Sequence, residues 1–127
     1  MSSSLPPSIL VIDEDSQLTY LIQRYALSCG CRCISAHDAD MALLLALQDR
    51  PALIVLDIAT QSAQSRQLVQ RLKAERATFD IPLVICSAVA DGIRIWEEGA
   101  DYYLGKPVLY DDFVATLTEA GVSLPQE

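Results

Sequence analysis

Short runs of apolar residues recur along the chain, and between them apolar residues return every three or four positions. The short runs cover residues 8–12, 31–36, 52–57, 83–86 and 102–104. Runs of this length that end at polar or turn-forming residues are typical of buried strands, and the longer spacing is typical of amphipathic helices. The pattern therefore predicts strands and helices in alternation.

Five helices are predicted after these strands. The first is capped by Ser16 and ends at Gly30, the second is capped by Asp38 or Asp40 and ends before Pro51, the third carries Leu68, Val69 and Leu72, and the last two cover residues 93–98 and 110–120. This alternation predicts a doubly wound α/β domain of the flavodoxin-like (βα)5 class, with a five-stranded parallel sheet and helices on both faces.

Acidic residues stand where two of the predicted strands end. Asp57 closes the run that begins at residue 52, and Asp13 and Glu14 follow the run at 8–12. The carboxyl ends of parallel strands meet at one edge of a sheet, where ligands bind, so we expect the three acids to share a pocket. Acids that merely solubilise turns are the alternative for either strand taken alone.

Two further polar residues follow strands that should end at the same edge. Ser87 follows the run at 83–86, and Lys106 comes just after the last strand. Clustered carboxylates need a cation, and oxygen ligands without imidazole or thiolate suit Mg²⁺. Asp57 is then a nucleophile toward phosphorus, with the Ser87 hydroxyl and the Lys106 ammonium binding phosphoryl oxygens.

Length, composition and charge limit the function classes. About half of the 127 residues are apolar, which suits one domain; we place it at 8–121, with loose tails at 1–7 and 122–127. The net charge is −8 and the nine Lys and Arg residues are scattered, so direct binding of nucleic acid is not expected. Without a signal-like leader or a membrane-spanning run, we expect a cytoplasmic protein that stays off the membrane.

The cysteines and the single histidine do not suggest a metal centre or a catalytic triad. Cys29, Cys31, Cys33 and Cys86 lack the Cys-x2-Cys spacing of zinc sites, and we expect reduced, packed thiols. His37 lies in a polar stretch that predicts a solvated turn.

The strand-end residues together resemble the receiver domain of two-component response regulators, from about Ile9 to Ala120. The segments that carry the resemblance are 9–15 with its acidic pair, 54–57 with a phosphoacceptor, 84–88 with Ser in place of the commoner switch Thr, and the Lys-Pro segment 99–107. The resemblance implies that Tyr103 is the switch aromatic and that the backbone carbonyl of Ala59 is a further Mg²⁺ ligand.

Two departures from the family pattern affect these expectations. Residues 58–65 contain neither the Pro nor the Gly that the family usually shows after the phosphoacceptor, so we expect this loop either to take another path or to be mobile. The interval from Ser87 to Lys106 is about three residues short, roughly one helical turn, which predicts a reduced fourth helix. Trp96 in that helix belongs either to an apolar contact patch or to the cover of the sheet.

The resemblance implies a function with two alternatives. The first hypothesis is a phosphorelay receiver that takes a phosphoryl group on Asp57 from a histidine kinase or phosphotransfer protein and reports it through Ser87 and Tyr103. Such a receiver meets a target, or a second copy, through the face made by the fourth helix, fifth strand and fifth helix. The alternatives are a receiver-like interaction module that needs no phosphorylation, and a flavodoxin-like nucleotide or flavin binder. A nucleotide or flavin binder needs a Gly-rich phosphate-binding loop, but Asp-Glu-Asp occupies the first turn of this chain at 13–15.

Overall fold

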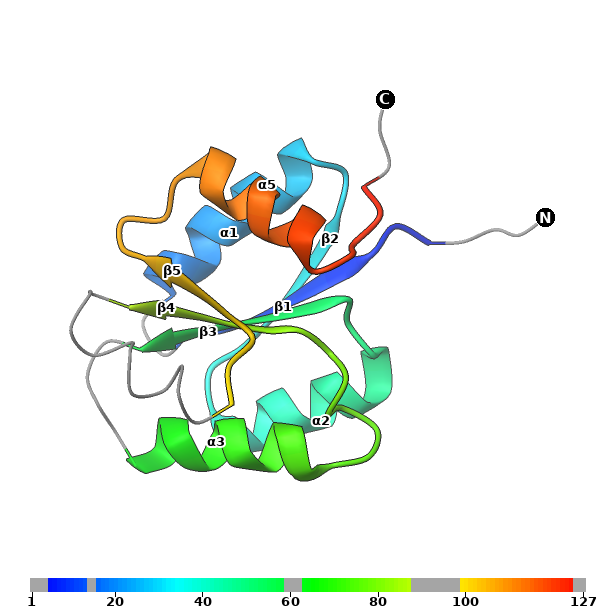
Figure 1. Ribbon diagram of the computed structural model, residues 1–127, viewed down its shortest axis with the longest axis vertical. Helices are drawn as coiled ribbons and strands as arrows, with labels where there is room; N and C mark the ends of the chain where they lie inside the picture. The colour runs from blue at the N-terminus through cyan, green and yellow to red at the C-terminus, as the bar shows by residue number, and fades with distance from the viewer. Residues whose placement is uncertain (1–4, 14–15, 59–62, 88–98, 125–127) are drawn as a thin grey trace.

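The computed structural model describes residues 5–13, 16–58, 63–87 and 99–124. Its elements are β1 (Ser8–Ile12), α1 (Gln17–Ser28), β2 (Arg32–Ala36), α2 (Ala39–Asp49), β3 (Leu53–Ile58), α3 (Ala63–Ala74), β4 (Leu83–Ser87), β5 (Tyr102–Gly105) and α5 (Tyr110–Glu119). The five strands form one parallel sheet in the order β2-β1-β3-β4-β5. In Figure 1, α1 and α5 cover one face of the sheet, and α2 and α3 cover the other.

The predicted α/β fold is therefore confirmed, and each predicted strand agrees with an observed one to within a residue at either end. The predicted fourth helix at 93–98, with Trp96, lies outside the described residues. So do two of the expected metal ligands, Glu14 and Ala59.

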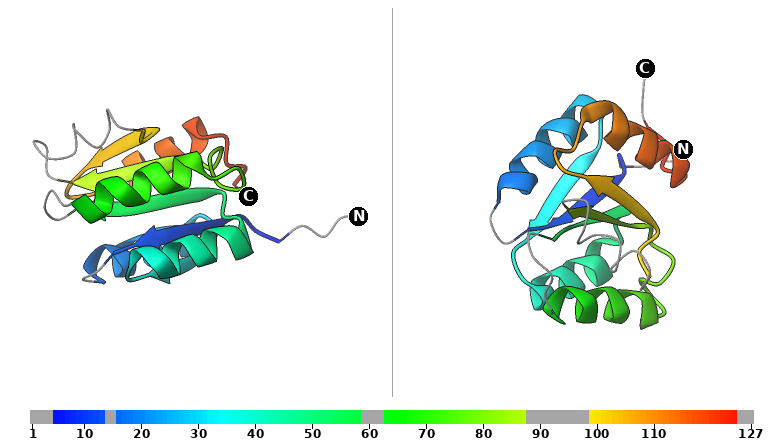
Figure 2. Two further views of the ribbon diagram at one scale, coloured as in Figure 1. Left: turned by 90° about the horizontal axis from the view of Figure 1, so that it is seen from below. Right: turned by 60° about the vertical axis from the view of Figure 1, so that its left-hand side comes forward.

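The strands bury both faces because alternate residues point to opposite helical layers. Leu10, Ile54 and Ile85 belong to the apolar cluster beneath α2 and α3, whereas Val55 and Val84 belong to the cluster beneath α1 and α5. This two-sided burial explains why the strands are continuous apolar runs rather than alternating ones. Figure 2 shows α2 and α3 lying side by side across one face of the sheet. The two helices are linked by an ion pair, with Arg71 Nη1 of α3 3.9 Å from Asp40 Oδ1 of α2.

Two of the predicted helix ends agree with the structure, and one predicted cap does not. Gly30, with φ of 80°, follows the last turn of α1, as predicted. Asp38 rather than Asp40 caps α2, since its Oδ1 accepts a 2.8 Å hydrogen bond from the Met41 amide. The prediction that Ser16 caps α1 is wrong: Ser16 holds the N-cap position with φ of 70°, but its side chain makes no capping hydrogen bond.

The described ends of the two tails touch the domain. The Pro7 carbonyl accepts a 2.8 Å hydrogen bond from the Arg32 amide, and Val122 and Leu124 pack against the cluster beneath α1 and α5. The domain limits of 8–121 stay a prediction. Within the described ranges, no helix combines the length and the apolar character needed to cross a bilayer.

Candidate functional site

The carboxyl ends of β1, β3, β4 and β5 meet at one edge of the sheet and bring four of the predicted residues together. The register pairs Ile58 with Ser87 and Ser87 with Gly105, so these strands end at the same level. Asp13 follows β1, Asp57 is the penultimate residue of β3, Ser87 ends β4 and Lys106 follows β5. The sheet register, rather than any local sequence feature, sets the distances among the four.

Asp57 forms an ion pair with Lys106. The Lys106 ammonium contacts Asp57 Oδ1; the side chain of Asp57 is 8% exposed and that of Lys106 is 33% exposed. Burial raises the pKa of Asp57 above its ordinary value, and the neighbouring Asp13 raises it further, while Lys106 opposes both. The pKa of Asp57 therefore reflects burial and Asp13 on one side and the Lys106 ammonium on the other.

Asp13 is held by main-chain groups from two directions. Its side chain is buried, and its Oδ2 accepts a 3.0 Å hydrogen bond from the backbone amide of Thr19 in the first turn of α1. Its own amide donates to the Ala36 carbonyl at 3.0 Å. Asp13 thus satisfies a helix N-terminus, which favours a negative charge at that position. It makes the side-chain contact that was expected of Ser16.

Thr19 is the neighbour of the site that sequence reasoning missed. It contributes its backbone amide. Every residue except proline has such a donor, so the residue type gave no indication of this contact. His37, exposed as predicted, places its Nδ1 3.3 Å from the Asp13 carbonyl oxygen and approaches the site only through that main-chain contact.

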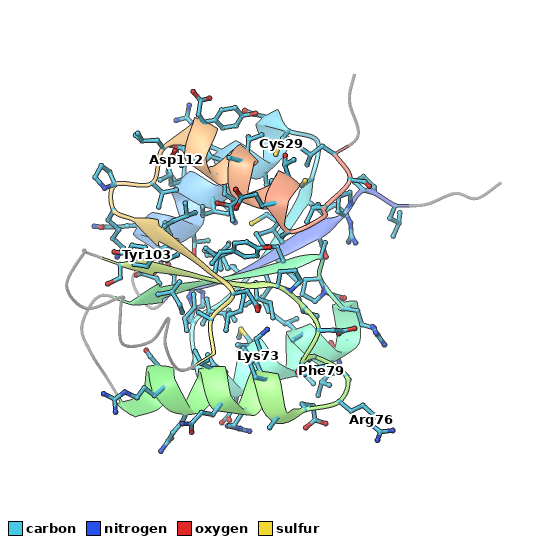
Figure 3. All side chains as sticks on the ribbon, viewed as in Figure 1. Cys29, Lys73, Arg76, Phe79, Tyr103 and Asp112 are labelled. Carbon is cyan, nitrogen blue, oxygen red and sulfur yellow. The ribbon has the colours of Figure 1, made fainter. Side chains whose placement is uncertain are left out.

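Ser87 is the point to which both the lysine segment and Tyr103 are attached. Its backbone carbonyl accepts hydrogen bonds from the Lys106 amide at 3.1 Å and from the Tyr103 hydroxyl at 3.0 Å. Ser87 is fully buried and Tyr103 is half-buried. In Figure 3, Tyr103 lies on the side of the molecule where β3 and β4 end. A displacement of the Ser87 main chain would therefore reach Tyr103 directly.

The described donor atoms fit a hard divalent cation. Among the described residues, Asp57 interacts with the carboxyl group of Asp13 as well as with the Lys106 ammonium, so two carboxyl groups adjoin in a partly buried place. Cys86 pairs with Asp57 in the sheet register, but burial raises its pKa to about 12, and a neutral thiol is a poor ligand. Oxygen ligands without imidazole or thiolate suit Mg²⁺. No group of three or more His, Cys, Asp or Glu residues suited to a metal occurs in the described ranges, which exclude Glu14.

Known proteins resemble the chain over most of its length. Residues 9–118 match the response regulator receiver domain. The DNA-binding dual master transcriptional regulator RpaA of Synechocystis sp. is 32% identical over 112 residues, which cover 86% of this chain and 46% of that protein. The transcriptional regulatory protein PrrA of Mycobacterium tuberculosis is 35% identical over 112 residues, covering 86% and 47%. The chain spans about half the length of the curated relatives it matches.

Solved structures share the fold. A putative response regulator from Chloroflexus aurantiacus superposes with a TM-score of 0.81 at 21% identity, covering 91% of this chain and 97% of that one. The receiver domain of the Francisella response regulator 1452 gives a TM-score of 0.76 at 25% identity, covering 90% and 95%.

Proposed function

This chain belongs to the response regulator receiver domain family of two-component signalling, and from that membership we propose that Asp57 accepts a phosphoryl group from a phosphohistidine. The donor is a histidine kinase or a phosphotransfer protein. The observation that carries the proposal is the buried Asp57 carboxylate held against the Lys106 ammonium beside Asp13, at the edge of the sheet where ligands bind.

Each residue has a separate task in the transfer. An Asp57 carboxylate oxygen attacks phosphorus, the phosphorus–nitrogen bond of the donor breaks, and the leaving imidazole takes up a proton from solvent. The product is an acyl phosphate on Asp57. The Lys106 ammonium keeps the nucleophile ionised and then pairs with a phosphoryl oxygen, and the Ser87 hydroxyl donates to another.

A magnesium ion fits the acids of the site. Asp13 and Asp57 would hold it, together with Glu14 and the Ala59 carbonyl, which lie outside the described residues. When bound, Mg²⁺ neutralises charge on the carboxylates and on the incoming phosphoryl group.

The signal passes through Ser87 and Tyr103 in this proposal. A phosphoryl group draws the Ser87 hydroxyl toward it, and the Tyr103 hydroxyl already rests on the Ser87 carbonyl at 3.0 Å. A shift at Ser87 therefore weakens the bond that keeps Tyr103 in its present rotamer, and the population of its other rotamers rises. Partners, either a target protein or a second copy, meet the face that contains β5 and α5 and to which the sequence assigns the predicted fourth helix, whose residues lie outside those described. In a longer protein the signal would pass to an output domain.

The test is phosphorylation by a small donor. The purified chain is incubated with acetyl phosphate, with and without Mg²⁺, beside Asp57→Asn, and the intact mass is measured. One added phosphoryl group that needs both Mg²⁺ and Asp57 supports the proposal. No added mass, together with amide NMR signals of Asp57 and Lys106 that stay unchanged in Mg²⁺ and beryllofluoride, rejects it.

A second function is favoured by the loop after Asp57. Residues 58–65 lack the Pro and Gly of the family pattern, and this loop follows the phosphoacceptor directly. The second function is a receiver-like interaction module that binds its partner without phosphorylation. Its expected result is a partner affinity that Asp57→Asn and Mg²⁺ leave unchanged. A partner affinity that changes with acetyl phosphate in the wild type and not in Asp57→Asn would contradict it.

A further inference from the structure

The outer face of α2 is apolar. Met41, Leu44 and Leu47 are 41%, 54% and 43% exposed. The inner face carries Ala42 and Ala46, which are fully buried against the sheet. Three of the five large apolar side chains of this helix therefore point to solvent, while Leu43 and Leu45 are half-buried and pack against the core beside the two alanines.

This arrangement differs from that of an ordinary surface helix, which turns polar residues outward. The charged residues of α2 lie at its two ends: Asp38 and Asp40 at the amino end, and Asp49 and Arg50 at the carboxyl end. The middle of the helix is apolar all round, and a helix of that kind is usually buried on every side. Figure 2 shows α2 on the outside of the molecule, beside α3.

We propose that α2 packs antiparallel against α2 of a second copy of this chain, in a contact centred on Leu44. The three exposed side chains are spaced evenly, three residues before and three residues after Leu44. A two-fold axis at Leu44 places Leu44 against its own copy. Met41 and the partner's Leu47 then lie at the same level on opposite flanks of this leucine pair, and the same arrangement recurs at the other end of the contact. The apolar patch is thus complementary to itself, which is the requirement for a two-fold interface.

The charges at the ends of α2 favour the antiparallel direction. Asp40, 95% exposed in its side chain and already 3.9 Å from Nη1 of Arg71 through its Oδ1, stands one turn before Leu44, and Arg50 is the residue at the C-cap. Antiparallel pairing brings Asp40 and the partner's Arg50 to the same end and the same flank. By helix geometry Arg50 lies about 120° from Leu44 on the same flank as Asp40, at the edge of the contact, whereas Asp49 lies about 140° from Leu44 on the opposite flank. The opposed helix dipoles add to the preference.

The expected dimer is weak. A patch one helix wide is smaller than the roughly 800 Å² per partner of a standard interface. We therefore expect reversible association with a dissociation constant on the order of 10–100 µM. The contact involves none of the residues of the acidic site, and its test needs no phosphoryl donor.

Sedimentation equilibrium of the full chain from roughly 5 to 500 µM tests the proposal. We expect a monomer–dimer equilibrium for the wild type and a dissociation constant raised at least about tenfold in Leu44→Glu. The matched control is Leu27→Glu on α1, where Leu27 is 81% exposed, and it should dimerise like the wild type. Circular dichroism melting confirms that both variants fold.

A charge exchange tests the direction of pairing. Asp40→Arg and Arg50→Asp should each weaken the dimer, and the double variant should regain most of the affinity. A wild type that stays monomeric over the whole range overturns the proposal. So does a dimer that survives Leu44→Glu, because it would lie on another face. A dimer that Leu44→Glu removes without any response to the charge exchange overturns the antiparallel direction.

Discussion

Replacing Lys106 by Met removes the ammonium that faces Asp57 while keeping a side chain of similar length. Removal of one member of a fully buried ion pair costs about 3–5 kcal/mol, since the remaining charge is buried without a partner. Asp57 is 8% exposed, but the Lys106 side chain is 33% exposed, so water replaces part of the lost interaction. We therefore expect Lys106→Met to lower the free energy of unfolding at pH 7.5 by about 2 kcal/mol.

The pH dependence of that loss identifies its origin. Burial raises the pKa of Asp57 above its ordinary 3.8, so ionisation costs folded-state stability as the pH rises through the folded pKa. Without Lys106 the pKa rises further and the cost grows. Below about pH 3.8 the carboxyl is protonated in both the folded and the unfolded chain, and the charge-dependent loss vanishes.

Urea denaturation of four proteins measures the effect as a double-mutant cycle: wild type, Lys106→Met, Asp57→Asn and the double variant. In the Asp57→Asn background no buried carboxylate loses its partner. Lys106→Met should then lower the free energy of unfolding by less than about 0.5 kcal/mol. An equal loss in both backgrounds would refute the electrostatic reasoning, because the lysine would then act through the conformation of its own segment. A loss that stays the same between pH 7.5 and 4 would refute it as well.

Three further outcomes are expected. Tyr103→Phe removes the hydrogen bond to the Ser87 carbonyl and should cost about 1 kcal/mol in urea denaturation; an unchanged midpoint would mean that this bond does not hold the ring. Asp38→Ala removes the cap that accepts from the Met41 amide and should cost about 1 kcal/mol, whereas Asp38→Asn should cost much less; equal losses would argue against capping. Cys86 is fully buried, and burial raises its pKa to about 12, so iodoacetamide at pH 8 should modify it only through unfolding; labelling that urea does not accelerate would contradict its burial.

The layout of the fold follows from the order of apolar and polar residues along the chain. Apolar runs of three to six residues alternating with helical spacing allow few arrangements other than a parallel sheet covered on both faces. Polar residues directly after the strands then had to reach one edge of that sheet. For this reason Asp13, Asp57, Ser87 and Lys106 were predicted as a group, and the structure brings them together.

The contacts that these groups make depend on how the strands and helices pack together. Ser16 had the chemistry of a cap, yet Asp13 accepts from the first turn of α1, because the end of β1 delivers a buried carboxylate there. The bond from Tyr103 to the Ser87 carbonyl likewise depends on the register between β4 and β5.

The sequence also does not show which face of α2 packs against the core. Leucines and alanines both recur at helical spacing along this helix, so either face fits the apolar pattern. In the folded chain Ala42 and Ala46 are fully buried, Leu43 and Leu45 pack partly against the core, and Leu44 is left in solvent. Local patterns specify elements because neighbouring residues determine them. Contacts between elements depend on how closely segments far apart in the chain approach one another, and that is settled only when the whole core packs.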